Sequence, residues 1–449
     1  MTILTWSRAR LAATLITSVT LTGACGLLDT TQPAAIDPGT LDSPEGAASL
    51  RLGAISDFGF VKDGDGSEFD DGLILLSGLL ADEFEHSTTP PSEQEIDQRT
   101  TALINPNLSD VYRNLHKARA GAEHAAEALQ KFLLEPGSTP DIAEMLALAG
   151  YTYLYFAEDF CSGVPFGKVR GDTVTFGTPL TTAETYQAAL AKFDSALAHP
   201  GLAEDDGTIT NLALLGRART LLDMGQFAEA GAVAADVPTD FLYVTEHSES
   251  PLRLQNAIFT YGQAGLWSLS DQEGGVGLAY RSANDPRVPY TDTEDFGLDL
   301  ITPQFNLDKY PDATSPVPVA DGTEARLIEA EAALQAGDVS GMTTILNDLR
   351  ANAISPALGN LAVPGSSDEA VDLLFSERAF WLFATGHRLG DMRRLVRPAP
   401  TGYGRPVNSV FPNGAYHKGG TYGSDVNLPI PIEEQNNPNA RTGCIDRNP

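Results

Sequence analysis

Residues 181–200 read TTAETYQAALAKFDSALAHP, and this stretch decides the fold of the 449-residue chain. Its aromatic and alanine residues recur three and four positions apart, at Tyr186, Ala189, Phe193 and Ala196. This spacing places them on one face of a helix, which ends before Pro200. Thr181 and Glu184 have the spacing of a capping box and mark the start of the helix.

Two looser copies of this pattern follow further along the chain. The first places small, turn-forming and aromatic residues at Ala218, Gly225, Phe227 and Ala230, and the second places Ala330, Gly337, Val339 and Met342 in the same order. All three stretches resemble tetratricopeptide repeats, in which small residues admit a neighbouring helix. Chance spacing in ordinary alanine-rich helices is the alternative for any single copy.

The periodicity divides the chain into two parts. Residues 44–237 are mostly helical in pattern and contain the first two repeat-like stretches. Residues 238–449 include two irregular stretches rich in Gly, Pro and Asp, 238–322 and 398–449. Ser366 and Glu369 open a further helix. We therefore expect a mainly α protein with degenerate repeats and long irregular insertions, which are usually functional in compact proteins.

The charge balance excludes two classes of function. The chain carries 29 Lys and Arg against 60 Asp and Glu, a formal net charge of −31. A sequence-independent nucleic-acid binder needs a basic surface to replace phosphate counterions, and a protein held electrostatically to anionic lipid needs the same. The excess of carboxylates argues against both.

The N-terminus predicts export and lipidation. Arg8 and Arg10 precede an apolar run from Leu11 to Val19, which is too short to span a bilayer permanently. Leu21-Thr22-Gly23-Ala24-Cys25 then resembles a lipobox, with Thr22 where Leu is more usual. We expect a lipoprotein signal peptide over 1–24, lipidation of Cys25 and a tether over 25–43, with plain secretion as the alternative.

Cys161 and Cys444 are the two cysteines that remain after Cys25. An exported chain leaves the reducing cytosol, so an even remainder favours a disulfide. The bridge would close a loop of nearly three hundred residues, which in the chain-entropy model stabilises a fold by about 5 kcal/mol. Two unrelated thiols are the alternative.

Several stretches together resemble one family, the SusD/RagB-like outer-membrane nutrient-binding lipoproteins. The most recognisable is Glu377–Arg394, ERAFWLFATGHRLGDMRR. The others, in chain order, are residues 77–83, 111–119, 153–165, 285–287, 325–332, 346–351, 428–431 and 436–439. Leu389 stands where many relatives have an aromatic residue, and Cys161-Ser162-Gly163 replaces the commoner Phe-Gly-Asp. The departures suggest a divergent branch, so a preference for starch is not carried over.

The resemblance implies a non-catalytic protein, anchored by lipid in the outer membrane and exposed at the cell surface. It implies binding of an oligosaccharide or another oligomeric nutrient, and delivery to a SusC-like TonB-dependent transporter. A tetratricopeptide-type envelope scaffold that binds other proteins is the alternative function. An exported glycosidase is a third hypothesis, but no two carboxylates stand out as a catalytic pair and no nucleophile or phosphate-binding motif is present.

The Glu377–Arg394 stretch also has a physical interpretation. Gly386 permits a sharp break between two helices, and the second helix is rich in arginine. We expect Glu377, Arg388 and Asp391 to form a partly buried ion-pair knot at this junction, with a structural role.

No metal or cofactor site is expected. The best metal candidate is the acidic loop Asp63–Gly72, since clustered carboxylates suit Ca²⁺. It departs from the EF-hand pattern, because Ile74 stands where a bidentate Glu is needed and Glu68 where Gly belongs. A solvated acidic turn is therefore the preferred interpretation, and the sequence does not decide whether the Asp63–Asp71 segment binds calcium.

Aromatic residues in the irregular segments are the candidates for ligand binding. They stand among Gly, Asp and Asn, and the combination suits a sugar, whose C–H faces stack on rings while its hydroxyls find polar partners. The candidates are Trp267, Tyr280, Tyr290, Tyr403, Tyr416 and Tyr422, with Phe296 and Tyr310 in the same segments. For any one ring, the alternative is that it anchors its own loop.

Overall fold

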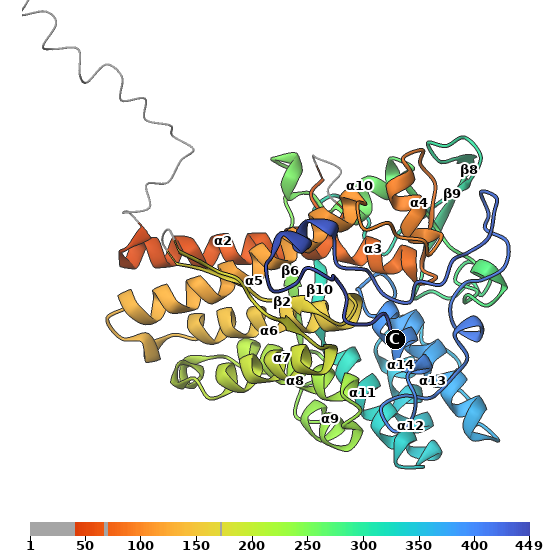
Figure 1. Ribbon diagram of the computed structural model, residues 1–449. Helices are drawn as coiled ribbons and strands as arrows, with labels where there is room; N and C mark the ends of the chain where they lie inside the picture. Colours follow the sequence, from red (N-terminus) through yellow and green to blue (C-terminus); the bar gives the residue numbers. More distant parts are fainter. Residues whose placement is uncertain (1–40, 67–70, 171–172) are drawn as a thin grey trace, which may run out of the picture.

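Figure 1 shows the computed structural model of the protein, which describes residues 41–66, 71–170 and 173–449. The predicted signal peptide, Cys25 and most of the predicted tether lie outside these residues. The helices are α2 (Pro44–Asp63), α3 (Leu73–Leu80), α4 (Pro91–Asp97), α5 (Pro106–Phe132), α6 (Asp141–Asp159), α7 (Thr182–Leu197), α8 (Thr208–Asp223), α9 (Phe227–Ala234), α10 (Ala257–Gln263), α11 (Gly322–Gln335), α12 (Val339–Asn352), α13 (Ser367–Trp381) and α14 (Arg388–Val396).

The strands are short and form two-stranded antiparallel pairs. The pairs are β1 (Phe84–His86) with β7 (Trp267–Leu269), β2 (Val164–Pro165) with β5 (Pro179–Leu180), β3 (Lys168–Arg170) with β4 (Thr173–Thr175), β6 (Leu242–Thr245) with β10 (Val317–Asp321), and β8 (Tyr290–Phe296) with β9 (Pro303–Leu307). Short 3₁₀ turns are η3 (Pro136–Ser138), η4 (Pro200–Glu204), η5 (Leu252–Leu254), η6 (Glu273–Gly275), η7 (Val407–Ser409) and η8 (Ile432–Asn436). The mainly α prediction is confirmed.

The helices stack one on the next, as the repeat pattern predicts. Along the chain, α2 packs on α5, α5 on α6, α6 on α7, α7 on α8, α8 on α9, α9 on α11 and α11 on α12 (Figure 1). Phe193 of α7 is completely buried between α6 and α8. A Cβ atom at Gly150 or Gly216 would approach its ring within 2.8 or 2.3 Å, so small residues are required at both positions.

Local signals in the repeat-like stretches have the predicted geometry. Thr181 and Glu184 form a complete capping box at the start of α7. Gly225 and Gly337 end α8 and α11 with φ angles of 76° and 80°, a left-handed conformation that favours glycine. At Ser366 the hydroxyl caps α13, but the Glu369 side chain accepts from the backbone of Gly365 instead of completing a box.

The irregular segments surround the ends of this helical stack. Residues 238–322 contain one short helix, α10, between strands and turns, and residues 398–449 contain only the 3₁₀ turns η7 and η8. In Figure 1, α4, α10 and the β8–β9 hairpin lie at the same end of the molecule. Within the described part of the chain, every helix is too short or too polar to cross a membrane.

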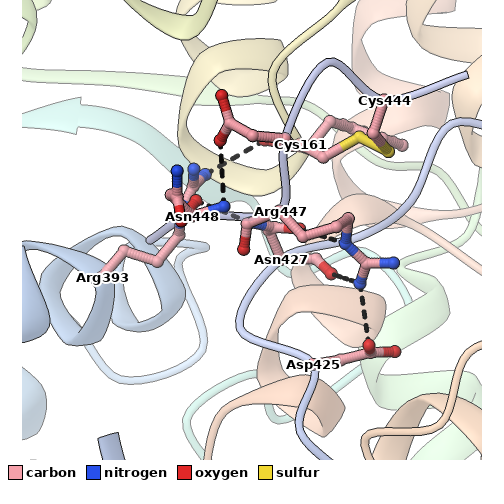
Figure 2. Close-up of a disulfide and its surroundings, with 9 residues drawn as sticks. Cys161, Arg393, Asp425, Asn427, Cys444, Arg447 and Asn448 are labelled. Atoms are coloured by element: carbon pink, nitrogen blue, oxygen red, sulfur yellow. Dashed lines mark hydrogen bonds and ion pairs between the residues drawn. A yellow bond between two sulfur atoms is a disulfide. The ribbon is translucent and has the colours of Figure 1, made fainter. Parts of the chain in front are cut away.

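A disulfide joins Cys161 to Cys444 across 283 residues, as predicted (Figure 2). Hydrogen bonds hold the chain end beside it. The amide of Ile445 donates to the carbonyl oxygen of Ser162 at 2.7 Å, and Arg447 pairs with Asp425 at 2.9 Å. The bridge therefore attaches the C-terminal segment to the end of α6.

Buried ion pairs join the helical stack to α13 and α14. Arg394 is almost fully buried and donates to Glu331 on α11, Asp223 on α8 and Asp391, all at 2.6–2.7 Å. Arg378 on α13 also donates to Asp391 at 2.8 Å. Burial alone would raise the pKa of Asp391, but the two guanidinium groups outweigh it and lower this pKa well below its usual range.

The predicted knot among Glu377, Arg388 and Asp391 needs correction. All three side chains are buried and ion-paired, but each with partners outside the trio. The pairs are Glu377 with Arg287 and Arg350, Arg388 with Asp82, and Asp391 with Arg378 and Arg394. Asp82, Arg287 and Arg350 lie outside the Glu377–Arg394 stretch, so that stretch alone did not indicate them, whereas Arg378 and Arg394 lie within it.

Replacing both cysteines, Cys161→Ala with Cys444→Ala, should lower the free energy of unfolding by about 2–5 kcal/mol, because the unfolded chain regains the entropy that the closed loop removes. Urea denaturation measures the difference. Dithiothreitol should destabilise the native chain by a similar amount and leave the double variant unchanged. Equal stability of all four samples would contradict a stabilising role for the bridge.

Arg394→Met should lower the free energy of unfolding by about 3–5 kcal/mol, since it leaves three buried carboxylates without their shared cation. The matched control is Arg405→Met, because Arg405 pairs with the exposed carboxylates of Asp368 and Asp372. That change should alter stability by less than about 1 kcal/mol. Similar losses of unfolding free energy in both variants would show that the buried Arg394 cluster contributes no more to stability than an exposed ion pair does.

Candidate functional site

Three of the predicted ligand-binding rings lie in the core. Trp267 and Tyr280 are 1% and 0% exposed, and Tyr310 is also buried. The Trp267 ring packs 4.4 Å from that of Phe84, and the Tyr280 ring 4.7 Å from that of Phe383. A ring without an exposed face offers nothing for a sugar to stack on. For these residues the structure fits the alternative interpretation, in which a ring anchors its own loop.

Two further candidates are half-buried. Tyr403 packs 5.1 Å from Phe375 of α13, and its hydroxyl donates to Glu331 at 3.1 Å. It therefore fastens the segment after α14 to the helical stack. Tyr290 packs 6.0 Å from Phe305 across the β8–β9 hairpin. Neither Tyr290 nor Tyr403 has a ring contact with another of the predicted ligand-binding rings.

Tyr416 and Tyr422 are brought together, with ring centroids 5.2 Å apart and planes nearly perpendicular. The Tyr416 hydroxyl donates to Asp97 at the end of α4 at 2.8 Å, and the Tyr422 hydroxyl donates to Glu273 at 3.0 Å. Tyr416 is buried and Tyr422 is half-buried. The two tyrosines thus connect distant parts of the chain, because Tyr422 is 149 residues from Glu273 and Tyr416 is 319 residues from Asp97.

The carboxyl groups below these rings are shielded from solvent. Burial, together with the mutual repulsion of Asp97 and Glu273, raises the pKa of Glu273 well above its usual range, and burial also raises that of Asp97. Burial likewise raises the pKa of Glu85, on the neighbouring β1, to about 7. Asp97 and Glu273 are both buried, and they accept hydrogen bonds from the hydroxyls of Tyr416, Tyr422 and Ser270 and from the backbone amide of His86.

Lys418 holds three loops together beside the tyrosine pair. Its ammonium group pairs with Asp299 at 2.6 Å and donates to Nδ1 of His86 at 2.7 Å and to the carbonyl oxygen of Thr88 at 2.9 Å. Burial and the neighbouring Lys418 charge lower the pKa of His86 to about 3, so its neutral ring can accept this bond.

We define the loop face as residues 84–90, 290–303 and 413–424, the three segments that meet at Lys418. Its accessible rings are Phe296, which is 53% exposed, the exposed His417 and the half-buried Tyr422. His417 donates through Nε2 to the carbonyl oxygen of His86 at 3.2 Å. The sequence analysis missed His417 and Lys418, although their place before Gly419 and Gly420 in an aromatic-rich irregular segment is a usable signal.

The acidic loop Asp63–Gly72 falls partly outside the described residues, which exclude 67–70. Of its described carboxylates, Asp63 is buried and pairs with Lys62 and His247, and Asp71 accepts a hydrogen bond from Asn107. Among the described residues, no three His, Cys, Asp or Glu side chains are grouped so as to hold a metal ion. The preferred interpretation, a solvated acidic turn, is wrong for the buried Asp63 and Asp71 and stays a prediction for the rest of the loop.

Several solved structures with the same architecture are named as carbohydrate-binding or glycan-binding proteins. Neither a family model nor a curated protein matches the sequence. A surface glycan-binding protein A from Bacteroides uniformis matches with a TM-score of 0.66 and 13% identity, over 89% of this chain and 99% of that one. A SusD-like carbohydrate-binding protein from Bacteroides fragilis matches with a TM-score of 0.65 and 16% identity, over the same shares.

A SusD superfamily protein from Bacteroides thetaiotaomicron matches with a TM-score of 0.63 and 15% identity, over 91% of this chain and all of that one. At such low identity the likeness concerns the fold, and it extends over nearly the whole described chain. The chain therefore has the SusD-like fold that its sequence resemblance predicted.

Proposed function

We propose that this protein binds an oligosaccharide at the loop face and does not cleave it. The observation that carries the proposal is the SusD-like fold, which this chain shares over nearly its whole length with structures named as glycan-binding and carbohydrate-binding proteins. The loop face adds a local argument, because three loops present rings and polar groups there on a base fixed by Lys418.

The accessible groups of the loop face suit a neutral sugar. The rings of Phe296 and Tyr422 offer surfaces on which the C–H faces of a pyranose can stack. The imidazole of His417 and the exposed backbone of Gly419 and Gly420 offer hydrogen-bond partners for hydroxyl groups. The Asp97–Glu273 pair is enclosed beneath the tyrosines, which supports capture without hydrolysis.

The membrane anchor and the transport partner are further parts of this proposal. Lipidation of Cys25 would hold the protein in the outer membrane at the cell surface. Stable anchoring needs more than one acyl chain, because each buried CH₂ contributes only about 0.8 kcal/mol. From that position the protein would pass the bound oligosaccharide to a SusC-like TonB-dependent transporter.

Phe296→Ala and Tyr422→Ala should each weaken binding of a neutral oligosaccharide about tenfold, because each removes a stacking surface. A glycan array with the purified full-length protein identifies a neutral ligand, and calorimetry then measures the affinities. The matched control is Val363→Ala, which removes an exposed apolar side chain outside the loop face. Release of shorter sugars from the bound glycan, or equal losses in all three variants, would contradict the proposal.

Cys25→Ser should move the protein from the membrane fraction to the soluble fraction, because the serine hydroxyl cannot receive the thioether-linked lipid. Immunoblots of fractionated cells measure the distribution. The Cys161→Ala, Cys444→Ala double variant serves as the control and should stay with the membrane. Retention of Cys25→Ser in the membrane fraction would refute the lipid anchor.

A further inference from the structure

A groove runs along α5 on a part of the molecule separate from the loop face. A cavity of about 520 Å³ lies between α5, the β3–β4 hairpin and the turn η8. Tyr112, His116 and Phe176 are among its lining residues. A second cavity of about 420 Å³ continues toward the end of α5 and shares Arg119 and the segment 167–169 with the first. We call the two cavities together the α5 groove.

Two buried polar atoms on lining side chains of the α5 groove have no protein partner. Arg119 is 3% exposed, and two of its nitrogens donate at 2.7 Å to Glu123 and to the carbonyl oxygen of Gly167, but its Nε has no hydrogen-bond partner. Nε2 of His116 is also buried without a partner. Such atoms typically cost about 1–3 kcal/mol each. Both are shielded from solvent, so a ligand reaches them only if the groove wall shifts.

The imidazole of His116 lies within an aromatic wall. Its centroid is 4.7 Å from that of Tyr112 and 4.4 Å from that of Phe156. Burial, with a smaller contribution from the charge of Arg119, lowers the pKa of His116 to about 3, so the ring is neutral at physiological pH. Tyr112 and Phe156 are 5% and 1% exposed, so the ring surface that is open to a sugar at this cavity is that of Phe176, which is 51% exposed.

The charge of the larger cavity is opposite to that of the chain. Four of its lining side chains are cationic and two are carboxylates, whereas the whole chain has twice as many acids as bases. Arg113 and Lys117 stand 67% and 61% exposed on adjacent positions of α5, paired with Asp110 and Asp57. Exposed ion pairs of this kind contribute little, so both cations can turn to a ligand without a large loss.

We propose that the α5 groove binds an acidic oligosaccharide, a sugar chain that carries carboxylate groups, at a site distinct from the loop face. A sugar ring stacks on Phe176, which is 51% exposed, and the carboxylates pair with Arg113 and Lys117. The inference takes the general ligand class from the proposed function, and its site and its charge preference come from the lining of the larger cavity.

The test uses tetragalacturonic acid and its methyl ester, which has the same rings without the charge. Calorimetry with the full-length protein should show at least about tenfold tighter binding of the acid, and this preference should shrink as salt is raised. The double variant Arg113→Gln, Lys117→Gln should remove the preference. Its matched control is Arg253→Gln, which removes an exposed cation outside the groove and should leave binding unchanged.

Three results would overturn the proposal. Equal affinity for the acid and the ester would exclude recognition of the carboxylates, and unchanged acid binding in the double variant would place the site elsewhere. Displacement of the acid by millimolar inorganic phosphate or by phosphatidylglycerol vesicles would show a general anion site rather than a sugar site. Phe296→Ala and Tyr422→Ala should not affect the acid, so failure at the loop face and failure at the groove are distinguishable.

Discussion

The fold depends on the charge-paired contact between Arg394 and the carboxylates of Glu331, Asp223 and Asp391. A buried guanidinium is tolerated only with good hydrogen bonds on several sides, and here three helices supply them. Because α8, α11 and α14 must all be in place to complete the cluster, it specifies how the helical stack joins the rest of the chain. The irregular segments that form the loop face then pack against helices whose relative positions are fixed.

Local features of this architecture follow from the sequence. Helical spacing, the Thr181 capping box and the turn glycines Gly225 and Gly337 act within a few residues, so their outcome does not depend on the rest of the chain. The disulfide could be predicted for a different reason, since only Cys161 and Cys444 remained besides Cys25 in a chain whose N-terminus predicts export. The ion-pair partners could not be predicted, because Glu331 on α11 and Arg394 on α14 are 63 residues apart and meet only in the packed fold.

The candidate rings show where sequence reasoning reaches its limit. An aromatic residue among Gly, Asp and Asn has the same local pattern whether its ring faces solvent or core. Trp267 became buried because β7 pairs with β1, a strand nearly two hundred residues earlier, and places the ring against Phe84. Tyr422 kept partial exposure because its hydroxyl is held by Glu273 from a distant turn. The exposure of each aromatic ring is therefore determined by contacts with distant parts of the chain, and the local sequence composition does not indicate those contacts.

The distribution of arginine explains why a cationic groove is unusual in this molecule. Arg219, Arg378, Arg388 and Arg394 are buried in ion pairs, so much of the positive charge never reaches the surface. Their carboxylate partners are buried with them, so the surface keeps the acidic excess of the chain. At physiological salt the field of that surface repels anions only over roughly 8 Å. Exposed cations grouped on one groove wall can therefore attract a carboxylate locally, even though the protein as a whole carries a large negative charge.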